Sequence, residues 1–243
     1  MKRSVLLLTF LSFTAISFAQ SKSKSLLGSV KDAIGKTKGG SSALSNEEII
    51  AGLKEALSQG ATNSSGKLSA ADGFFKDAAV KILMPEEVRK VEKKMRTLGM
   101  GKMVDNAILS MNRAAEDASK SAAPIFLSAI KGMSVSDALN ILRGTDTAAT
   151  GYLRKTTTNP LTDAFRPVVE ASLVKVDATK YWKDVFSVYN KFSTEPVNTD
   201  INAYVTEKAL YGIFYYVAEE EKKIRKDPAA RATDVLKKVF GAK

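Results

Sequence analysis

The stretch YVTEKALYGIFYYVAEEEKKIRKDPAAR, from Tyr204 to Arg231, decides the fold of this chain. Its first half is apolar at helical spacing, and its second half is densely charged. The apolar run from Ala209 to Ala218 has only ten residues, whereas a helix that spans a bilayer needs about 20. The stretch therefore predicts a buried central helix of a helical domain, and not a membrane span.

A set of charged groups follows the apolar run. Glu220 and Glu221 lie at the margin of the predicted apolar face, and Glu221 precedes Arg225 by one turn, in the orientation that favours an ion pair. A half-buried carboxylate beside a cleft is an acid, a base or a ligand. In a closed core it is one half of an ion pair, with Arg113, Arg154 or Arg225, that fixes the register of two helices. The structural interpretation is favoured, because charged partners lie nearby in the sequence.

Polar residues also flank the clearest helical seam. In residues 102–133, apolar side chains recur at a 4-3-4-3-4 spacing that keeps one narrow face against a partner helix: Val104, Ile108, Met111, Ala115, Ala118 and Ala122. Asn112 and Glu116, one turn apart beside this seam, are expected to project partly inward and to need partners. We expect a buried network with Arg154 or with the carboxylates of the Tyr204–Arg231 stretch, and a ligand site as the alternative. The candidate ligand-binding cluster is Asn112, Arg113, Glu116, Arg154, Glu220, Glu221 and Arg225.

Helical periodicity extends over almost the whole chain after Ser45, and strand-like alternation is hard to find. Ser45 with Glu48 and Ser134 with Asp137 are capping pairs that begin helices. Besides the Tyr204–Arg231 stretch, the predicted helices cover residues 45–59, 68–81, 85 to about 99, 102–133, 138–143, 147–154, 161–176, 178–192 and 230–240. Breaks are predicted at residues 60–66 and 156–160, a division at Pro124 and a kink at Pro167. Asp146 is expected to cap the helix at 147–154, and the helix at 178–192 has an aromatic face. The pattern predicts an all-α fold, a compact domain of about eight to ten helices.

The N-terminus has the pattern of an export signal. A basic start precedes an apolar run from Val5 to Ile16, and small residues follow. We predict a signal peptide over residues 1–19, cleaved before Gln20, and a location in the periplasm or outside the cell. Residues 20–43 are rich in Ser, Lys and Gly and are expected to form a flexible leader. Residues 44–243 are expected to form a single α-helical domain.

The composition restricts the chemistry. The chain has no histidine and no cysteine, which excludes His/Cys zinc sites, cysteine nucleophiles and Ser-His-Asp triads. Hydrolases that use carboxylates alone and oxygen-only sites for calcium or magnesium stay possible, but no spaced loop of the EF-hand kind is found in the sequence. We expect no catalytic residue, no metal site and no cofactor.

The net charge is +11 for the whole chain and 11 − 2 = +9 after loss of Lys2 and Arg3 with the signal peptide. Such a surplus favours contact with an anionic envelope component, such as a lipid headgroup, a glycan or a protein, and a solvated basic surface without a specific partner is the alternative. Nucleic-acid binding is not expected, because the basic residues are scattered and no known module appears.

Several motifs in one order resemble a bacterial family of exported, all-helical proteins, DUF4197, which is a domain of unknown function. They are MNRAAEDA (111–118), SDALNILRG (136–144), AATGYLR (148–154), the Tyr204–Arg231 stretch and VLKKVFG (235–241). The resemblance implies an exported helical protein over about residues 47–241. It implies no catalytic residue, cofactor or substrate.

The favoured function is a non-catalytic binding or interaction protein of the cell envelope. One alternative is a hydrolase of cell-wall glycan in which Glu220, Glu221 or Glu116 is the general acid. Another alternative is a carrier of a small apolar ligand, which predicts a sizeable apolar cavity.

Overall fold

The computed structural model describes residues 45–175 and 200–227, and in addition residues 182, 186, 190, 191, 196 and 237. Within this part of the chain every regular element is a helix, which confirms the predicted all-α class. The expected number of eight to ten helices is not confirmed. The predicted signal peptide and leader lie outside the described residues, and so do the predicted helices 178–192 and 230–240 apart from single residues.

The described elements follow one another along the chain in a fixed order. They are α2 (Asn46–Ser69), the short 3-10 helix η1 (Glu86–Val88), α3 (Arg89–Thr97), α4 (Gly101–Ser119), α5 (Ala122–Lys131), α6 (Val135–Arg143), α7 (Ala148–Val174) and α9 (Ile201–Lys226). Both predicted capping boxes are present, at the start of α2 and at the start of α6. Pro124 lies in the first turn of α5, where a backbone donor has no partner within the helix. The division of the 102–133 segment therefore falls just before Pro124.

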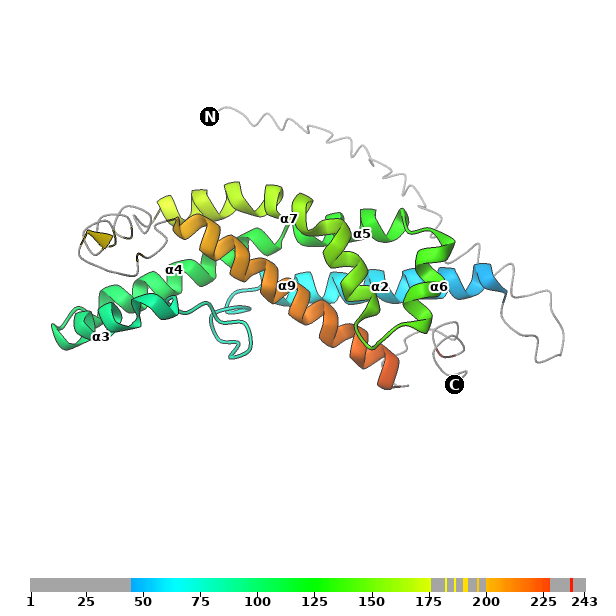
Figure 1. Ribbon diagram of the computed structural model, residues 1–243, viewed down its shortest axis with the longest axis horizontal. Coiled ribbons are helices and arrows are strands. Elements are labelled where there is room, and N and C mark those ends of the chain that lie inside the picture. The colour runs from blue at the N-terminus through cyan, green and yellow to red at the C-terminus, as the bar shows by residue number, and fades with distance from the viewer. Residues whose placement is uncertain are drawn as a thin grey trace, which may run out of the picture. The chain divides into compact units, whose positions relative to one another are not determined.

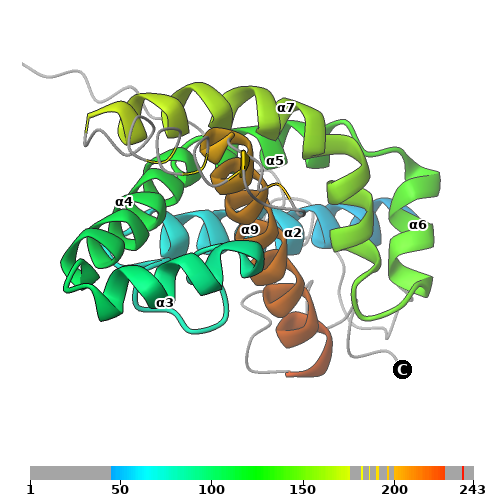
Figure 2. The same ribbon diagram turned by 60° about the vertical axis from the view of Figure 1, so that its left-hand side comes forward.

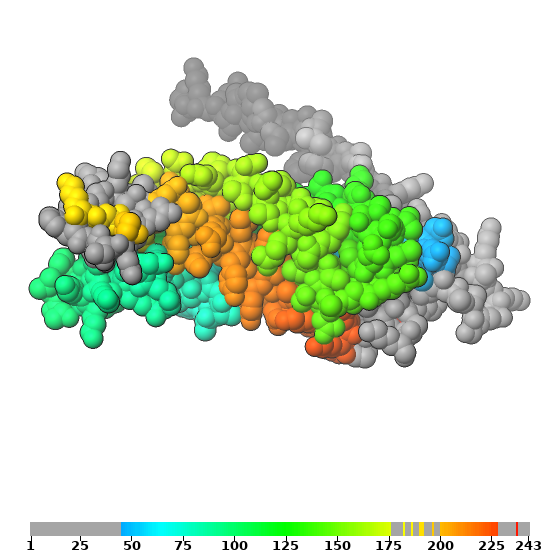
Figure 3. All heavy atoms as spheres, in the orientation of Figure 1, coloured from blue at the N-terminus to red at the C-terminus, as the bar shows by residue number. Residues whose placement is uncertain are grey.

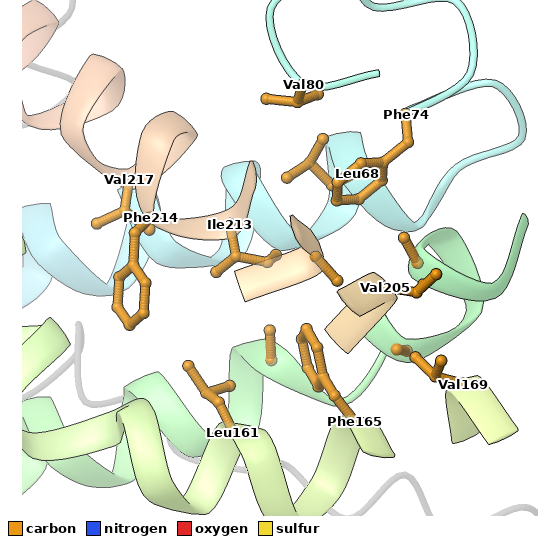
Figure 4. Packing of buried hydrophobic residues seen from close by; sticks show 14 of the residues in the cluster. Leu68, Phe74, Val80, Leu161, Phe165, Val169, Val205, Ile213, Phe214 and Val217 are labelled. Carbon is orange, nitrogen blue, oxygen red and sulfur yellow. The ribbon is translucent and has the colours of Figure 1, made fainter. Parts of the chain in front are cut away.

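Helix α9 is the central element, as its apolar run predicts. It lies between α2 on one side and α4 and α7 on the other (Figures 1 and 2). Its residues Val205, Ile213, Phe214 and Val217 are buried against α2, α7 and the loop after α2 (Figure 4). The six predicted seam residues of residues 102–133 are also buried, so the 4-3 spacing located a true core face.

The predicted break at residues 60–66 is wrong, because α2 runs through it without interruption. The hydroxyls of Ser64 and Ser65 donate to the carbonyl oxygens of Gly60, at 2.7 Å, and Ala61, at 2.8 Å, one turn earlier. A Cβ added to Gly60 would be 3.3 Å from the Glu220 Cβ of α9. The small residues therefore serve close packing of α2 on α9, and packing overrides their weak helix propensity.

The predicted helix at 68–81 is also wrong beyond Ser69. The chain instead forms turns and an extended segment from residue 70 to Pro85, which we call the 70–85 loop. Gly73 fits a tight turn, because a Cβ there would be 2.4 Å from the Lys67 carbonyl oxygen. Asp72 beside it has a φ of 68°, in the left-handed region. Local backbone geometry thus ends the helix where the apolar spacing alone predicts continuation.

Helix α7 contradicts a third expectation, the break at residues 156–160. It is continuous from Ala148 to Val174, with Pro160 and Pro167 inside it. Its buried residues, which include Leu153, Leu161 and Phe165, pack against α4 and α9. This burial offsets the cost of a proline inside a helix, about 3 kcal/mol each. The N-cap of α7 is Thr147, without a side-chain cap hydrogen bond, and not the predicted Asp146, whose carboxylate pairs with Lys226 at 2.9 Å.

The bounds and hydropathy of the described helices allow one further statement. No single helix among them is long and apolar enough to cross a membrane. The pair formed by Gly101–Lys131 and Val135–Arg143 reaches the required length and hydropathy only in combination, with a bend of 106° between its parts.

Candidate binding site

The side chain of Asn112, on α4, forms hydrogen bonds with the backbone of the 70–85 loop, as a neighbouring strand would. Its side-chain oxygen accepts a hydrogen bond from the Ile82 N–H at 2.8 Å, and its nitrogen donates to the Ile82 carbonyl oxygen at 2.8 Å. The same nitrogen donates to the carbonyl oxygen of Ile108 at 2.7 Å. Because Asn112 is fully buried, these bonds satisfy backbone groups that water does not reach.

Glu116, one turn further along α4, holds the start of the same loop. One carboxylate oxygen accepts the backbone N–H groups of Phe74, at 3.1 Å, and Phe75, at 3.2 Å. The other pairs with Arg113 at 2.6 Å, and Arg113 also reaches Asp72 at 2.6 Å. Glu116 is 4% exposed, so it is a buried charge whose oxygens are both occupied. Three of the predicted site residues therefore act together, and what they bind is the protein's own loop.

A third contact fixes the middle of the loop to α2 and α9. Asp77 accepts a hydrogen bond from the Tyr216 hydroxyl and pairs with Lys67 at 3.2 Å. Burial alone would raise the pKa of Asp77, but the bonds from Tyr216, Lys67 and the Ala79 N–H lower it below its ordinary value. The Lys67 ammonium lies 3.6 Å from the centre of the Tyr216 ring. Sequence spacing did not indicate this group, because its members come from three separate elements.

Glu221 and Arg225 form a second centre, at the junction of α6, α7 and α9. Glu221 accepts the first free N–H groups of α7, from Ala149 at 3.0 Å and Thr150 at 2.8 Å, and the Thr150 hydroxyl at 2.8 Å. Arg225 pairs with Glu221 at 2.9 Å and donates to the Ile141 carbonyl oxygen, at the end of α6, at 2.8 Å. Glu221 thus caps α7 from another helix. The predicted structural ion pair of these two residues is present.

The two remaining predicted residues lie apart from both centres. Glu220 is half-buried, and its carboxylate accepts a hydrogen bond from the Asn63 side chain at 3.4 Å. Arg154 is exposed, and its guanidinium lies 4.6 Å from the centre of the Phe214 ring. The expected joint network of Asn112 and Glu116 with Arg154 or with the α9 carboxylates is therefore not formed. The hollow beside Glu221 and Arg225 measures about 10 Å³, which is the size of one water.

A pocket of about 360 Å³ lies between the outer side of the 70–85 loop and α9. Residues 79–87 and Arg89 form one wall. Tyr204, Lys208 and Tyr211, spaced 4-3 along one face of α9, form the other. Asn112 and Glu116 of α4 hold the 70–85 loop, which forms the first wall, by hydrogen bonds. These two residues therefore shape the pocket without lining it. The 4-3 spacing of these three residues is a signal in the sequence, but the sequence does not show that the 70–85 loop lies opposite them.

The pocket combines tyrosines with ammonium groups. The Tyr204 hydroxyl donates to the Leu83 carbonyl oxygen at 2.8 Å. Burial, and then the negative charges of Glu87 and Glu207, raise the pKa of Tyr204 to about 12. Arg89 is occupied by Glu86 at 2.9 Å, whereas neither Lys81 nor Lys208 forms an ion pair within the described part of the chain. The charged and aromatic side chains of the lining are Lys81, Glu86, Glu87, Arg89, Tyr204, Lys208 and Tyr211.

These features place the chain in a class: an all-helical protein whose buried polar side chains fasten a loop and a helix junction, with an aromatic and cationic pocket on the fastened loop. The chain belongs to the family described as "Protein of unknown function (DUF4197)", which it matches over residues 43–241. The predicted resemblance is thereby confirmed. Neither a curated protein nor a solved structure matches the chain. In the described residues, no group of three acidic side chains is placed to hold a metal ion.

Proposed function

We propose that this chain is a non-catalytic binding protein of the cell envelope and that the pocket between the 70–85 loop and α9 binds an anionic envelope component. The observation that supports this proposal is the lining of the pocket, where three cationic side chains, Lys81, Arg89 and Lys208, outnumber the two acids, Glu86 and Glu87, and lie with Tyr204 and Tyr211. A volume of about 360 Å³ lies within the range of small-molecule sites, about 300–1,000 Å³. Tyrosine faces and ammonium groups together suit a ligand that has both an anionic group and an apolar or sugar-ring surface.

The envelope location is part of the proposal and rests on the N-terminal sequence pattern. A basic start, an apolar run and small residues before Gln20 are typical of an exported chain. The net charge is +11 for the whole chain and 11 − 2 = +9 without Lys2 and Arg3, and such a surplus suits a compartment that is bounded by anionic lipids and glycans.

The hydrolase alternative is less well supported by the geometry. A general acid must present a proton to its substrate. Both oxygens of Glu116 and both oxygens of Glu221 already accept hydrogen bonds from N–H or O–H donors of the protein. Among the residues that the structure describes, Glu220 has only the long contact to Asn63, so it is the residue that this alternative would require. The carrier alternative requires an apolar cavity, whereas the pocket described above has charged groups on both walls.

Photocrosslinking in living cells tests the binding proposal. A photoreactive phenylalanine analogue replaces Tyr211, which is 53% exposed and lines the pocket. The matched control has the same analogue at Leu127, which is 39% exposed on α5 and is not part of the pocket. We expect an adduct from position 211 that Lys208→Met removes, because this change deletes the charge and keeps most of the side-chain stem. Equal adducts at both positions, or none at 211, would refute the proposal.

A further inference from the structure

The turn between α3 and α4 has a composition that differs from the rest of the surface. Residues 93–103, KKMRTLGMGKM, contain four cations, no acid and four large apolar residues. Three of those apolar side chains are exposed: Leu98 at 72%, Met103 at 46% and Met100 at 39%. We call residues 93–103 the α3–α4 tip; Figure 3 shows this end of α3 and α4, in teal, at the left edge of the view. Contiguous exposed apolar side chains of this kind mark interaction surfaces.

Hydrogen bonds and ion pairs within the tip fix its backbone and leave its apolar side chains on the outside. Gly99, with a φ of 81°, ends α3 in a Schellman motif, in which the Met100 N–H reaches the Met95 carbonyl oxygen and the Gly99 N–H reaches that of Arg96. Arg96 pairs with Glu92 at 2.9 Å and with Asp105 at 2.8 Å, which ties α3 to α4. The hairpin is therefore closed by its own contacts, and Leu98 and Met100 are left on the outside of the turn.

The charges around the tip are mostly positive: residues 92–105 contain four cations and two acids. Both acids, Glu92 and Asp105, pair with the same cation, Arg96. Lys93, Lys94 and Lys102 are exposed, and none of them forms an ion pair among the residues that the structure describes. The lysine stems are long enough to place an ammonium beside the exposed apolar side chains while those side chains enter an apolar phase. The tip thus has exposed apolar side chains with three lysines, unpaired within the described residues, near them in the sequence.

We propose that the α3–α4 tip binds the surface of an anionic lipid bilayer. Leu98, Met100 and Met103 enter the boundary between headgroups and acyl chains, and the three lysines contact lipid phosphates. A protein partner fits less well, because a stable protein interface buries about 800 Å² on each side, far more than one helical turn offers. A bilayer needs no complementary groove and responds to a few apolar side chains combined with positive charge. This surface is separate from the pocket, and none of its residues lines that pocket.

The absence of cysteine from the chain permits a local test. Leu98→Cys is labelled with an environment-sensitive dye on the purified protein as it is recovered from expressing cells, after its N-terminus has been determined by mass spectrometry. Leu127→Cys, on α5, is the matched control. We expect a blue shift of the dye at position 98 on vesicles that contain phosphatidylglycerol, and none on pure phosphatidylcholine. The dye at position 127 is expected to stay unchanged, which separates the tip from any contact made by the N-terminal residues.

Charge variants test the lysines. Lys93→Gln, Lys94→Gln and Lys102→Gln are each expected to weaken vesicle binding about fivefold, and together about 100-fold. The control replaces three exposed lysines elsewhere, Lys131, Lys155 and Lys223, with Gln, which changes the net charge equally and is expected to weaken binding far less. Added salt is expected to weaken wild-type binding.

Three outcomes would overturn the proposal: equal blue shifts at positions 98 and 127, binding that does not depend on anionic lipid, or equal losses in the two triple variants. A blue shift at position 98 that grows with protein concentration in the absence of vesicles would overturn it as well, because the tip would then be a contact between copies of this chain. The pocket variant Lys208→Met is expected to bind vesicles like the wild type, so failure of the pocket proposal and failure of this one are distinguishable.

Discussion

Single side chains of α4 determine the conformation of a loop that has no regular structure of its own. Asn112 binds both polar backbone groups of Ile82, as a neighbouring strand would. Glu116 does the same for two consecutive N–H groups, at Phe74 and Phe75. Since the loop forms a wall of the pocket, these buried residues act on binding through the position of the loop.

Removal of the Asn112 side chain leaves the N–H and the carbonyl of Ile82 buried without a partner. Each unsatisfied group costs about 1–3 kcal/mol. We expect Asn112→Ala to lower the free energy of unfolding by about 3–5 kcal/mol, measured by urea denaturation. The control is Asn106→Ala, an exposed asparagine of the same helix, with an expected change within about 0.5 kcal/mol. Similar losses in the two variants would contradict the role assigned to Asn112.

Tyr204 is expected to make the stability of the protein depend on pH in the alkaline range. Its pKa is raised from the ordinary value of 10.0 to about 12, chiefly by burial. The folded state therefore favours the neutral phenol, and the stability from this group is complete below pH 10 and is lost as the pH rises toward 12. We expect Tyr204→Phe to be less stable than wild type by about 1 kcal/mol at neutral pH, from loss of its hydrogen bond.

The test of the alkaline effect compares unfolding at about pH 9.5, which is below the ordinary pKa of 10.0, with unfolding at about pH 11.5, which lies between that value and the raised pKa of about 12. We expect a smaller alkaline loss in Tyr204→Phe than in wild type. Tyr211→Phe, which removes an exposed hydroxyl, is the control for the loss of one tyrosine. An alkaline loss in Tyr204→Phe as large as that in wild type would mean that the phenol ionises equally well in the folded state.

Prediction of the candidate site from the sequence succeeded for burial and failed for partners. Asn112 and Glu116 were expected to project inward, and both are buried. Their loop partners lie 30 to 42 positions away, in the predicted helix 68–81 for Glu116 and directly after it, at Ile82, for Asn112. Spacing within one helix reveals which face is buried, but it contains no information about the loop that reaches that face. Glu221 and Arg225 were predicted more fully, because an i,i+4 pair is a local feature.

At the scale of elements, local signals predicted helix starts well, and interior breaks poorly. The two capping boxes depend on residues three positions apart and are both present. The breaks at 60–66 and 156–160 were inferred from Gly, Ser, Thr and Pro, yet α2 and α7 run through them. In both places tertiary packing decides, since small residues allow helices to approach and buried apolar neighbours stabilise the helix. No local rule distinguishes such a contact from a break.

Two helical glycines, Gly212 and Gly151, differ in whether a neighbouring element packs closely against them. A Cβ on Gly212 of α9 would be 2.5 Å from a carbon of the buried Phe74 ring, whereas a Cβ on Gly151 of α7 would meet nothing within 4 Å. Alanine in place of a helical glycine gains about 1 kcal/mol. We expect Gly151→Ala to raise the free energy of unfolding by up to about 1 kcal/mol. We expect Gly212→Ala to lower it by about 1–3 kcal/mol, because the core is overpacked. A gain in both variants, measured by urea denaturation, would show that Phe74 moves aside easily.

At the scale of the whole molecule, one apolar cluster connects the described elements. It extends from Leu53 of α2 through α4, α5 and α7 to Val217 of α9. Trp182 and Phe186 belong to the same cluster, with their ring centres 4.6 Å apart. Elements that share one apolar cluster lose their burial together, which favours a single cooperative transition.

The chain has one tryptophan, so its fluorescence reports on a single position, Trp182, which is 4% exposed. Circular dichroism in the far ultraviolet reports on all helices together. We expect urea unfolding curves from the two signals to coincide, because Trp182 and α9 contribute to one cluster. Phe214→Leu, a change on α9 beside Phe126, should move both midpoints to lower urea by the same amount. If the tryptophan signal changed first, or if Phe214→Leu shifted only the dichroism curve, Trp182 would belong to a unit that unfolds separately from the α9 core.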